Sequence, residues 1–185
     1  MIIKDIKKSK IFLTNHEFIY LKILTKSDVT SSYVQWLNNH NVTKFTELKK
    51  KKYNTNDVLM YVNEKYKSKS DFLFGIFYYK KHIGNIKLGS VDYYHKTANL
   101  SYFIGNQKYW GMGITTLVIG EIVKIAFEIL ALSKINASVY ENNKSSLSVL
   151  EKNNFVKEGI KRKDRVFDNK RIDCINYGLL KKSYE

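Results

Sequence analysis

The fold of this 185-residue chain is decided by residues 100–114, which read LSYFIGNQKYWGMGI. An apolar run typical of a β-strand, Leu100–Ile104, leads into a turn that contains Gly111 and Gly113. A long amphipathic helical pattern begins at Ile114. Such a turn directs several backbone N–H groups to one point at the positive end of a helix, where a phosphate or pyrophosphate can bind. The stretch therefore predicts an anion site between a strand and a helix.

Two common phosphate-binding motifs do not fit this turn. A dinucleotide-binding fold would place a third glycine at position 116, where this chain has Thr116, and its helix would follow the first strand of a βαβ unit. A nucleoside-triphosphate loop would need Gly-Lys-Ser/Thr, which the sequence lacks.

Outward from this stretch, periodicity predicts alternating strands and helices. The long helix is expected to bury one face, leaving Glu121, Lys124 and Glu128 to solvent. The buried face comprises Ile114, Leu117, Val118, Ile122, Ile125, Ala126, Ile129 and Leu130. Further helices are expected at 33–37 (capped within 25–28), from Asn54 or Thr55 to Tyr66, and at 144–151. Strands are expected at 11–13, 18–24, 72–79, 83–92, 97–104, 133–140, 155–161 and 171–180, with a turn at 14–16. No repeat or linker interrupts this order, so we expect one α/β domain over residues 1–185, a mixed, strongly twisted sheet flanked by helices.

Composition is that of a globular protein, with 44% hydrophobic and 26% charged residues. No apolar run approaches the ~20 residues that span a membrane, and the N-terminus lacks the apolar core of a signal peptide. The single cysteine, Cys174, excludes an internal disulfide framework and suits a reducing cytoplasm, so a packing role and a cytoplasmic location are expected.

The formal net charge of +15 does not by itself identify a partner. Lysine, asparagine, isoleucine and tyrosine are abundant and proline is absent, as an AT-rich coding sequence would produce. Arginine forks and aromatic platforms typical of nucleic-acid binding are not found, so no nucleic-acid partner is expected. The run Lys49–Lys52 is interpreted as a solvated loop.

A second segment, residues 143–155, helps to identify the family that the chain resembles. Asn143-Lys-Ser-Ser146 opens a short helix that is followed by Asn154-Phe155. Together with the glycine turn, residues 99–159 resemble the acetyl-CoA-binding half of the GCN5-related N-acetyltransferases (GNAT). Within that superfamily the chain looks most like the branch of ribosomal-protein N-terminal acetyltransferases and amino-sugar acetyltransferases. The resemblance as a whole covers residues 12–180 and is specific over residues 99–159.

The resemblance implies that acetyl-CoA is the cofactor. The family loop has the form Gln/Arg-x-x-Gly-x-Gly/Ala, and here Lys108 departs from it while Gly111 and Gly113 are in register. In the family this loop binds the pyrophosphate mainly through backbone N–H groups, and the preceding strand pairs with pantetheine. The implied cofactor contacts are Phe103, Ile104, Gly105, Lys108, Tyr109, Trp110, Gly111, Met112, Gly113, Ile114, Thr115, Asn143 and Ser146.

Asn143 and Ser146 each allow two interpretations. Asn143 is a natural helix cap, and by resemblance it also contacts pantetheine. Ser146 matches the serine that protonates the departing thiolate in the ribosomal-protein branch. Other members use a tyrosine four residues further on, where this chain has Leu150. Asn154 replaces the usual glycine and tolerates a left-handed backbone.

The acceptor side is less defined. Trp36 resembles a family signature near the acceptor, although core packing explains it equally well. Glu47, Tyr93 and Tyr94 are candidate pocket residues and His95 a candidate titrating group, each with a plain surface or turn role as the alternative. The four histidines show no ligand spacing, so no metal site is expected.

The resemblance implies transfer of an acetyl group from acetyl-CoA to a primary amine by direct attack. We expect the acceptor to be a small molecule, a nucleotide-linked amino sugar of surface-glycan synthesis. A protein N-terminus is the alternative acceptor, and a non-catalytic acyl-CoA-binding module is the alternative of another class. Homodimers are common in the family, so a homodimer is also among the expectations.

Overall fold

The structure is a computed structural model of the chain and describes residues 10–13 and 16–184. Within these residues eight strands form one mixed sheet in the order β1-β2-β3-β4-β5-β6-β8-β7. The pair β5–β6 is parallel and the other neighbours are antiparallel. The strands are β1 (Lys10–Leu13), β2 (His16–Ile23), β3 (Phe72–Tyr78), β4 (Lys81–Asp92), β5 (Thr97–Ile104), β6 (Lys134–Tyr140), β7 (Val156–Phe167) and β8 (Lys170–Leu180).

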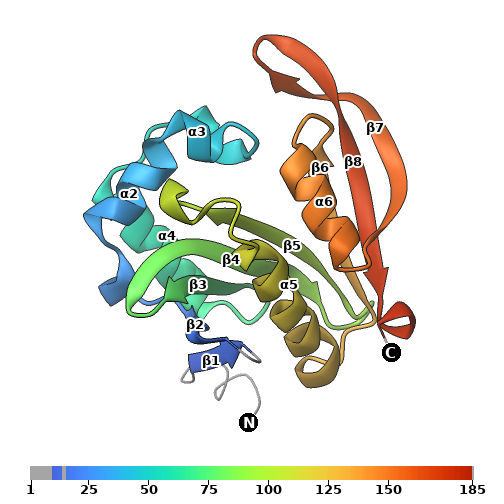
Figure 1. Cartoon of the computed structure of the whole chain (residues 1–185), viewed down its shortest axis with the longest axis horizontal. Helices are drawn as coiled ribbons and strands as arrows, with labels where there is room; N and C mark the ends of the chain where they lie inside the picture. The colour runs from blue at the N-terminus through green and yellow to red at the C-terminus, as the bar shows by residue number, and fades with distance from the viewer. Residues whose placement is uncertain (1–9, 14–15, 185) are drawn as a thin grey trace.

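Helices cover both faces of the sheet (Figure 1). On one face α5 and α6 lie over the larger apolar core, and on the other α2 and α4 pack on a second core. The helices are α2 (Ser31–Asn38), α3 (His40–Thr43), α4 (Thr55–Lys67), α5 (Ile114–Lys124) and α6 (Lys144–Lys152), with short turns η1 (Lys26–Asp28), η2 (Glu47–Lys50), η3 (Gln107–Tyr109), η4 (Ile125–Ile129) and η5 (Lys181–Ser183).

Polar caps fix where the N-terminal helices begin. Asn54 caps α4 in a capping box with Asp57, as one of the two predicted caps. Thr30 caps α2, its hydroxyl accepting from the Tyr33 N–H at 3.2 Å. The predicted cap at 25–28 begins the separate turn η1 instead, because Val29 is extended and ends that turn.

The long helix after the glycine turn differs from the predicted pattern in its second half. The α-helix ends at Lys124 and continues as a π-turn, Ile125–Ile129. The wider turn shifts the facing side chains by about one residue, so Phe127 is buried and Ile129 is 39% exposed. Leu117, at the margin of the predicted face, is also exposed, whereas the other predicted core residues are buried.

The parallel pair opens after three residues, and this opening positions the site. Thr97–Asn99 pairs with Lys134–Asn136 and the pairing then stops. β6 stays paired with β8 as far as Tyr140, so its upper half follows β8 and leaves β5. The edge of β5 beyond Asn99 is therefore unpaired on its β6 side.

The β7–β8 hairpin is longer than the predicted strands and rises above the rest of the sheet toward α3 (Figure 1). Its tip packs on the segment between α3 and η2: the rings of Phe167 and Phe45 stack at 5.1 Å. Lys49 donates from Nζ to the Val166 carbonyl at 2.8 Å. Lys49 is thus a contact residue, contrary to its interpretation as part of a solvated loop.

Other predictions concern single residues. Cys174 is 1% exposed, consistent with the packing role, and burial raises the pKa of its thiol. Asn154 has the expected left-handed backbone, with φ of 62°. Of the predicted turn at 14–16, residues 14 and 15 lie outside the described residues. In the part of the chain that the structure describes, no helix combines the length and apolarity needed to cross a membrane.

Candidate active site

The open edge of β5 presents backbone groups to the gap between β5 and β6. Gly105 N–H donates to the Ile83 carbonyl at 2.9 Å, and Phe103 lies opposite Asn85 on β4. Because antiparallel pairing alternates, Phe103 directs its N–H and C=O to β4, and Tyr102 and Ile104 direct theirs to the gap. The register therefore directs the main-chain groups of Tyr102, and not those of Phe103, to the gap.

The side chain of Trp110 already binds one group on this edge. Its indole Nε1–H donates to the Ile104 carbonyl at 2.8 Å, while the indole remains 44% exposed. This bond fixes the loop after β5 against the strand end. The N–H and C=O of Tyr102 and the N–H of Ile104 remain directed to the gap.

The loop of residues 106–113 is fixed by contacts at Asn106 and Tyr109, whereas the space around Gly111 and Gly113 is unoccupied by other described residues. Asn106 Oδ1 accepts from Lys108 N–H at 3.1 Å, and Tyr109 packs against Tyr78 with ring centroids 5.2 Å apart. Gly111 and Gly113 both have φ of 74°, the left-handed region that glycine adopts without strain. A Cβ built on either one meets no described atom within 4 Å.

The start of α5 supplies free amides at the positive end of a helix. The first intrahelical bond is donated by Thr116 N–H to the Gly113 carbonyl at 3.0 Å. The amides of Ile114 and Thr115 precede it and have no helical acceptor. The structure thus brings the predicted glycine turn and helix start to the mouth of the β5–β6 gap, with Met112 and Lys108 exposed beside it.

The first turn of α6 lies across the gap from β5. Asn143 Oδ1 accepts from Ser146 N–H at 3.3 Å, so Asn143 caps this helix. The Ser146 hydroxyl lies 2.7 Å from the Tyr102 hydroxyl. Burial is the main cause that raises the pKa of Tyr102 to about 12, so this phenol is neutral. Sequence reasoning missed Tyr102, because a tyrosine in an apolar strand carries no local signal.

Glu47 lies at the mouth of the gap, on the face opposite α6. Its Oε1 accepts from the Tyr140 hydroxyl at 2.9 Å and lies 3.4 Å from Arg165 Nε. It also pairs with Lys50. The Lys50 hydrogen bond is the main cause that lowers the pKa of Glu47, outweighing partial burial. Glu47 is therefore an ionised carboxylate already neutralised by its neighbours.

Trp36 and the β4–β5 turn contain the remaining candidate acceptor residues. Trp36 is 9% exposed and packs closely against Gly105, consistent with the core-packing alternative. Tyr93 and Tyr94 lie in the β4–β5 turn, at the other end of β5 from the glycine loop, about 25 Å of strand away. Tyr93 donates to the Lys69 carbonyl at 2.7 Å, and His95 shares the same turn. These three residues therefore lie away from the mouth of the β5–β6 gap.

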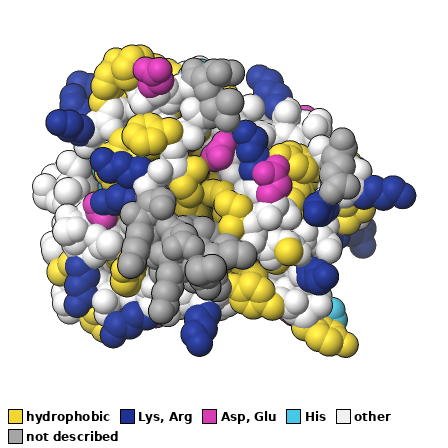
Figure 2. Space-filling view, turned by 90° about the horizontal axis from the view of Figure 1, so that it is seen from below, with side chains coloured by type: hydrophobic (Ala, Val, Ile, Leu, Met, Phe, Trp, Pro, Cys, Tyr) yellow, Lys and Arg dark blue, Asp and Glu magenta, His cyan; other side chains and the backbone are white. Residues whose placement is uncertain are grey.

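Among residues 10–13 and 16–184, no cluster of three or more metal-ligating side chains occurs. Figure 2, which views the molecule from below, shows Lys and Arg side chains dispersed around that face rather than gathered in one patch.

An open strand edge beside a helix that begins at a glycine turn, in a mixed sheet covered on both faces, defines the acyl-CoA N-acyltransferase class of fold. The model of the acetyltransferase (GNAT) domain family matches residues 19–156, and the chain belongs to this family.

Curated relatives from Bacillus subtilis (strain 168) match part of the chain. The putative ribosomal N-acetyltransferase YdaF is 29% identical over 111 residues, which are 60% of this chain and 60% of YdaF. The uncharacterized N-acetyltransferase YoaA is 31% identical over 102 residues, or 55% of this chain and 57% of YoaA. The matched stretches thus span less than two thirds of these relatives.

Solved structures share the fold over nearly the whole chain. The ribosomal L7/L12 alpha-N-protein acetyltransferase RimL, solved with coenzyme A, has a TM-score of 0.82 at 14% identity, covering 93% of this chain and 98% of RimL. A spermidine N-acetyltransferase from Vibrio cholerae, solved with CoA and spermine, has a TM-score of 0.81 at 21% identity, covering 90% and 98%. At these identities the likeness concerns the fold alone.

Proposed function

We propose that this protein is an acetyl-CoA-dependent N-acetyltransferase that acts on a nucleotide-linked amino sugar. The observation that carries the acetyltransferase activity is the convergence of three features on one gap. These are the open β5 edge at Tyr102 and Ile104, the glycine turn with free amides before Thr116, and the capped start of α6 at Ser146.

The residues around the gap fit the parts of acetyl-CoA. The amides of residues 111–115 provide donors for the pyrophosphate at the positive end of α5. The main-chain groups of Tyr102 and Ile104 fit the amides of the pantetheine arm, which would extend the sheet as another strand. When bound, acetyl-CoA supplies an activated thioester carbonyl. Lys108 adds an exposed positive charge beside the turn.

The chain's own groups account for two needs of the reaction. A backbone N–H on the β5 edge can donate to the carbonyl oxygen as negative charge develops there. Ser146, half-buried at the start of α6, can donate a proton to the departing thiolate. The amine attacks in its neutral form, because only that form has a free lone pair.

The acceptor face of the gap is polar but carries little free charge. Asn99 and Ser101 on β5 and Ser138 on β6 are exposed on the face opposite α5 and α6, and Ser138 donates to Asn176 Oδ1 at 2.8 Å. Hydroxyl and amide side chains both donate and accept, which suits the hydroxyl groups of a sugar. Glu47, at the mouth, is already paired with cations, which disfavours a polyamine.

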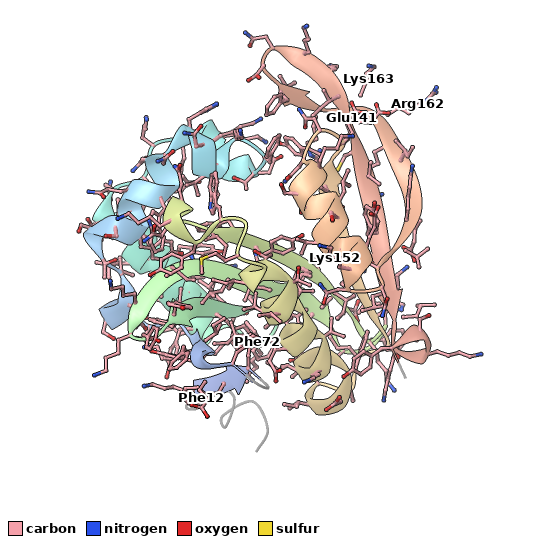
Figure 3. The ribbon with its side chains drawn as sticks, viewed as in Figure 1. Phe12, Phe72, Glu141, Lys152, Arg162 and Lys163 are labelled. Carbon is pink, nitrogen blue, oxygen red and sulfur yellow. The ribbon has the colours of Figure 1, made fainter. Side chains whose placement is uncertain are left out.

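The β7–β8 hairpin beside this face supports an anionic acceptor. All three arginines of the chain, Arg162, Arg165 and Arg171, lie on it. A cavity of about 390 Å³ part-way along it is lined by Glu141, Arg162, Lys163 and Asp173, the first three of which are labelled in Figure 3. Arginine and lysine side chains are the usual partners of a diphosphate.

A thiol-release assay over matched acceptors tests this proposal. The acceptors are a UDP-linked aminodeoxysugar, peptides that begin with Ala or Ser, and spermidine, each with product mass determined. We expect acetylation of the sugar nucleotide to be fastest. Peptide acetylation without sugar turnover would assign the protein to N-terminal acetylation, the alternative acceptor class. CoA binding with no turnover of any acceptor would favour the non-catalytic module.

Ser146→Ala distinguishes chemistry from binding in the same assay. If Ser146 is the acid, kcat falls by about 10²-fold with little change in acetyl-CoA affinity. Ser145→Ala, at the exposed neighbouring position, is the matched control and should leave kcat unchanged. Equal turnover in the two variants would remove Ser146 from the mechanism.

A further inference from the structure

Tyr102 and Ser146 form a hydroxyl–hydroxyl contact that belongs neither to the glycine turn nor to the Asn143 cap of α6. Tyr102 lies on β5 and Ser146 in the first turn of α6, 44 positions apart, and their hydroxyl oxygens are 2.7 Å apart. The contact crosses the gap on the face that carries α5 and α6. It joins the strand edge proposed for pantetheine to the residue proposed to meet the thiolate.

The direction of this hydrogen bond follows from the two hydroxyls. A phenol is a stronger acid than an aliphatic alcohol, and the alcohol oxygen is the better acceptor. The Tyr102 hydroxyl also lies 3.5 Å from the Ser146 carbonyl oxygen, so both neighbouring groups are acceptors for its proton. Tyr102 therefore donates to Ser146 Oγ. The hydrogen of Ser146 is then free to point elsewhere.

We propose that Tyr102 is a positioning residue that holds Ser146 with its O–H directed at the sulfur of CoA. This inference rests on the proposed function. Tyr102 stays neutral throughout and transfers no proton. As the carbon–sulfur bond breaks, Ser146 donates to the thiolate and regains a proton from solvent, while the attacking amine loses one to solvent. The hydrogen bond from Tyr102 polarises Ser146 and restricts its rotamer.

A purely structural role is the competing explanation, and the chain offers a matched control for it. Tyr177 on β8 also ties α6 to the sheet, donating to Glu151 Oε1 at 2.8 Å near the other end of the helix. Tyr102→Phe and Tyr177→Phe each remove one hydroxyl that anchors the same helix. Loosening of α6 would affect both variants alike, whereas positioning of Ser146 concerns Tyr102 alone.

The kinetic test uses the acceptor found by the thiol-release assay. Tyr102→Phe should lower kcat about tenfold, the effect of one lost hydrogen bond, with the KM for acetyl-CoA changed less than about twofold. Tyr177→Phe should retain wild-type kcat. In the Ser146→Ala background Tyr102→Phe should have no further effect, because the group that it positions is gone.

A second readout needs no turnover. A hydrogen bond from Ser146 favours the thiolate, so the pKa of the bound CoA thiol should fall below its free value of about 8.5. CoA affinity, measured by calorimetry, should therefore rise with pH toward that value. The rise should shrink in Tyr102→Phe and Ser146→Ala and persist in Tyr177→Phe. CoA lacking its sulfur should show no rise in any of these proteins.

The outcomes separate this inference from the proposed function. Wild-type kcat and an unchanged pH dependence of CoA affinity in Tyr102→Phe would overturn the positioning role while acetyl transfer stands. Equal losses in Tyr102→Phe and Tyr177→Phe would also overturn it, in favour of helix anchoring. Failure of the wild-type protein to bind CoA would overturn the proposed function itself.

Discussion

Gly105, at the exit of β5, should not tolerate even one added methyl group. A Cβ at this position would lie 2.1 Å from Trp36 Cδ2 and 2.3 Å from Cε3. The indole is 9% exposed, meets the His82 ring edge-on and lies at a tilt against the Tyr33 ring, so moving it would disturb both neighbours. Overpacking of a core costs about 1–3 kcal/mol, and contacts this short place Gly105→Ala in the upper part of that range.

A glycine-to-alanine substitution at Gly120 should instead increase the stability of the protein. Gly120, within α5, would place its Cβ 3.5 Å from Asn153 Oδ1, an ordinary contact. Replacing a helical glycine by alanine stabilises by about 0.5–1 kcal/mol, so Gly120→Ala should be more stable than the wild type. Urea unfolding of both variants, compared at equal m-value, measures the difference.

A double-mutant cycle identifies the clash as the cause. Trp36→Ala alone leaves a cavity and should cost about 3–5 kcal/mol. In that background Gly105→Ala should cost nothing further, because the ring that it strikes is gone. A Gly105→Ala variant as stable as the wild type, or an equal loss of unfolding free energy with and without Trp36, would show that the clash is not the cause.

Two further predictions concern the glycine turn and the partly buried carboxylate of Asp28. Gly113→Ala should cost about 1–2 kcal/mol through its left-handed backbone alone, since the space around it is open, and it should weaken CoA binding in calorimetry. For Asp28, burial raises the pKa, but hydrogen bonds from Lys22 and Thr25 outweigh it and the net pKa lies below the ordinary 3.8. The folded state is thus stabilised by the ionised carboxylate above that value, and the stability gap between wild type and Asp28→Asn should be present at pH 7 and close below about pH 4 in urea titrations.

The buried strands, and the glycine turn that follows β5, can be predicted from the sequence. The strand at 97–104 has the predicted bounds, because its apolar residues alternate and the β4–β5 turn separates it from its neighbour. The glycine turn and the Asn143 cap were also predicted, since each depends on local backbone chemistry. These features depend on neighbouring residues in the sequence, so they can be predicted before the fold is known.

Features that depend on distant contacts could not be predicted. The upper half of β7 is highly charged and shows no apolar alternation, yet pairing with β8 and packing of Phe167 on Phe45 extend it to residue 167. The π-turn after Lys124 moves the buried face of the helix by about one residue from the position that helical periodicity predicts. The Tyr102–Ser146 contact arises only when β5 and α6 are brought together by the sheet.

The most direct test of the account is amide hydrogen exchange of the protein with and without CoA. With CoA we expect slowed exchange at the amides of Tyr102 and Ile104 on the open β5 edge and across residues 111–115, and no such protection from NAD⁺ at the same concentration. Protection confined to other parts of the chain, or equal protection by NAD⁺, would contradict the assignment of this gap as an acetyl-CoA site.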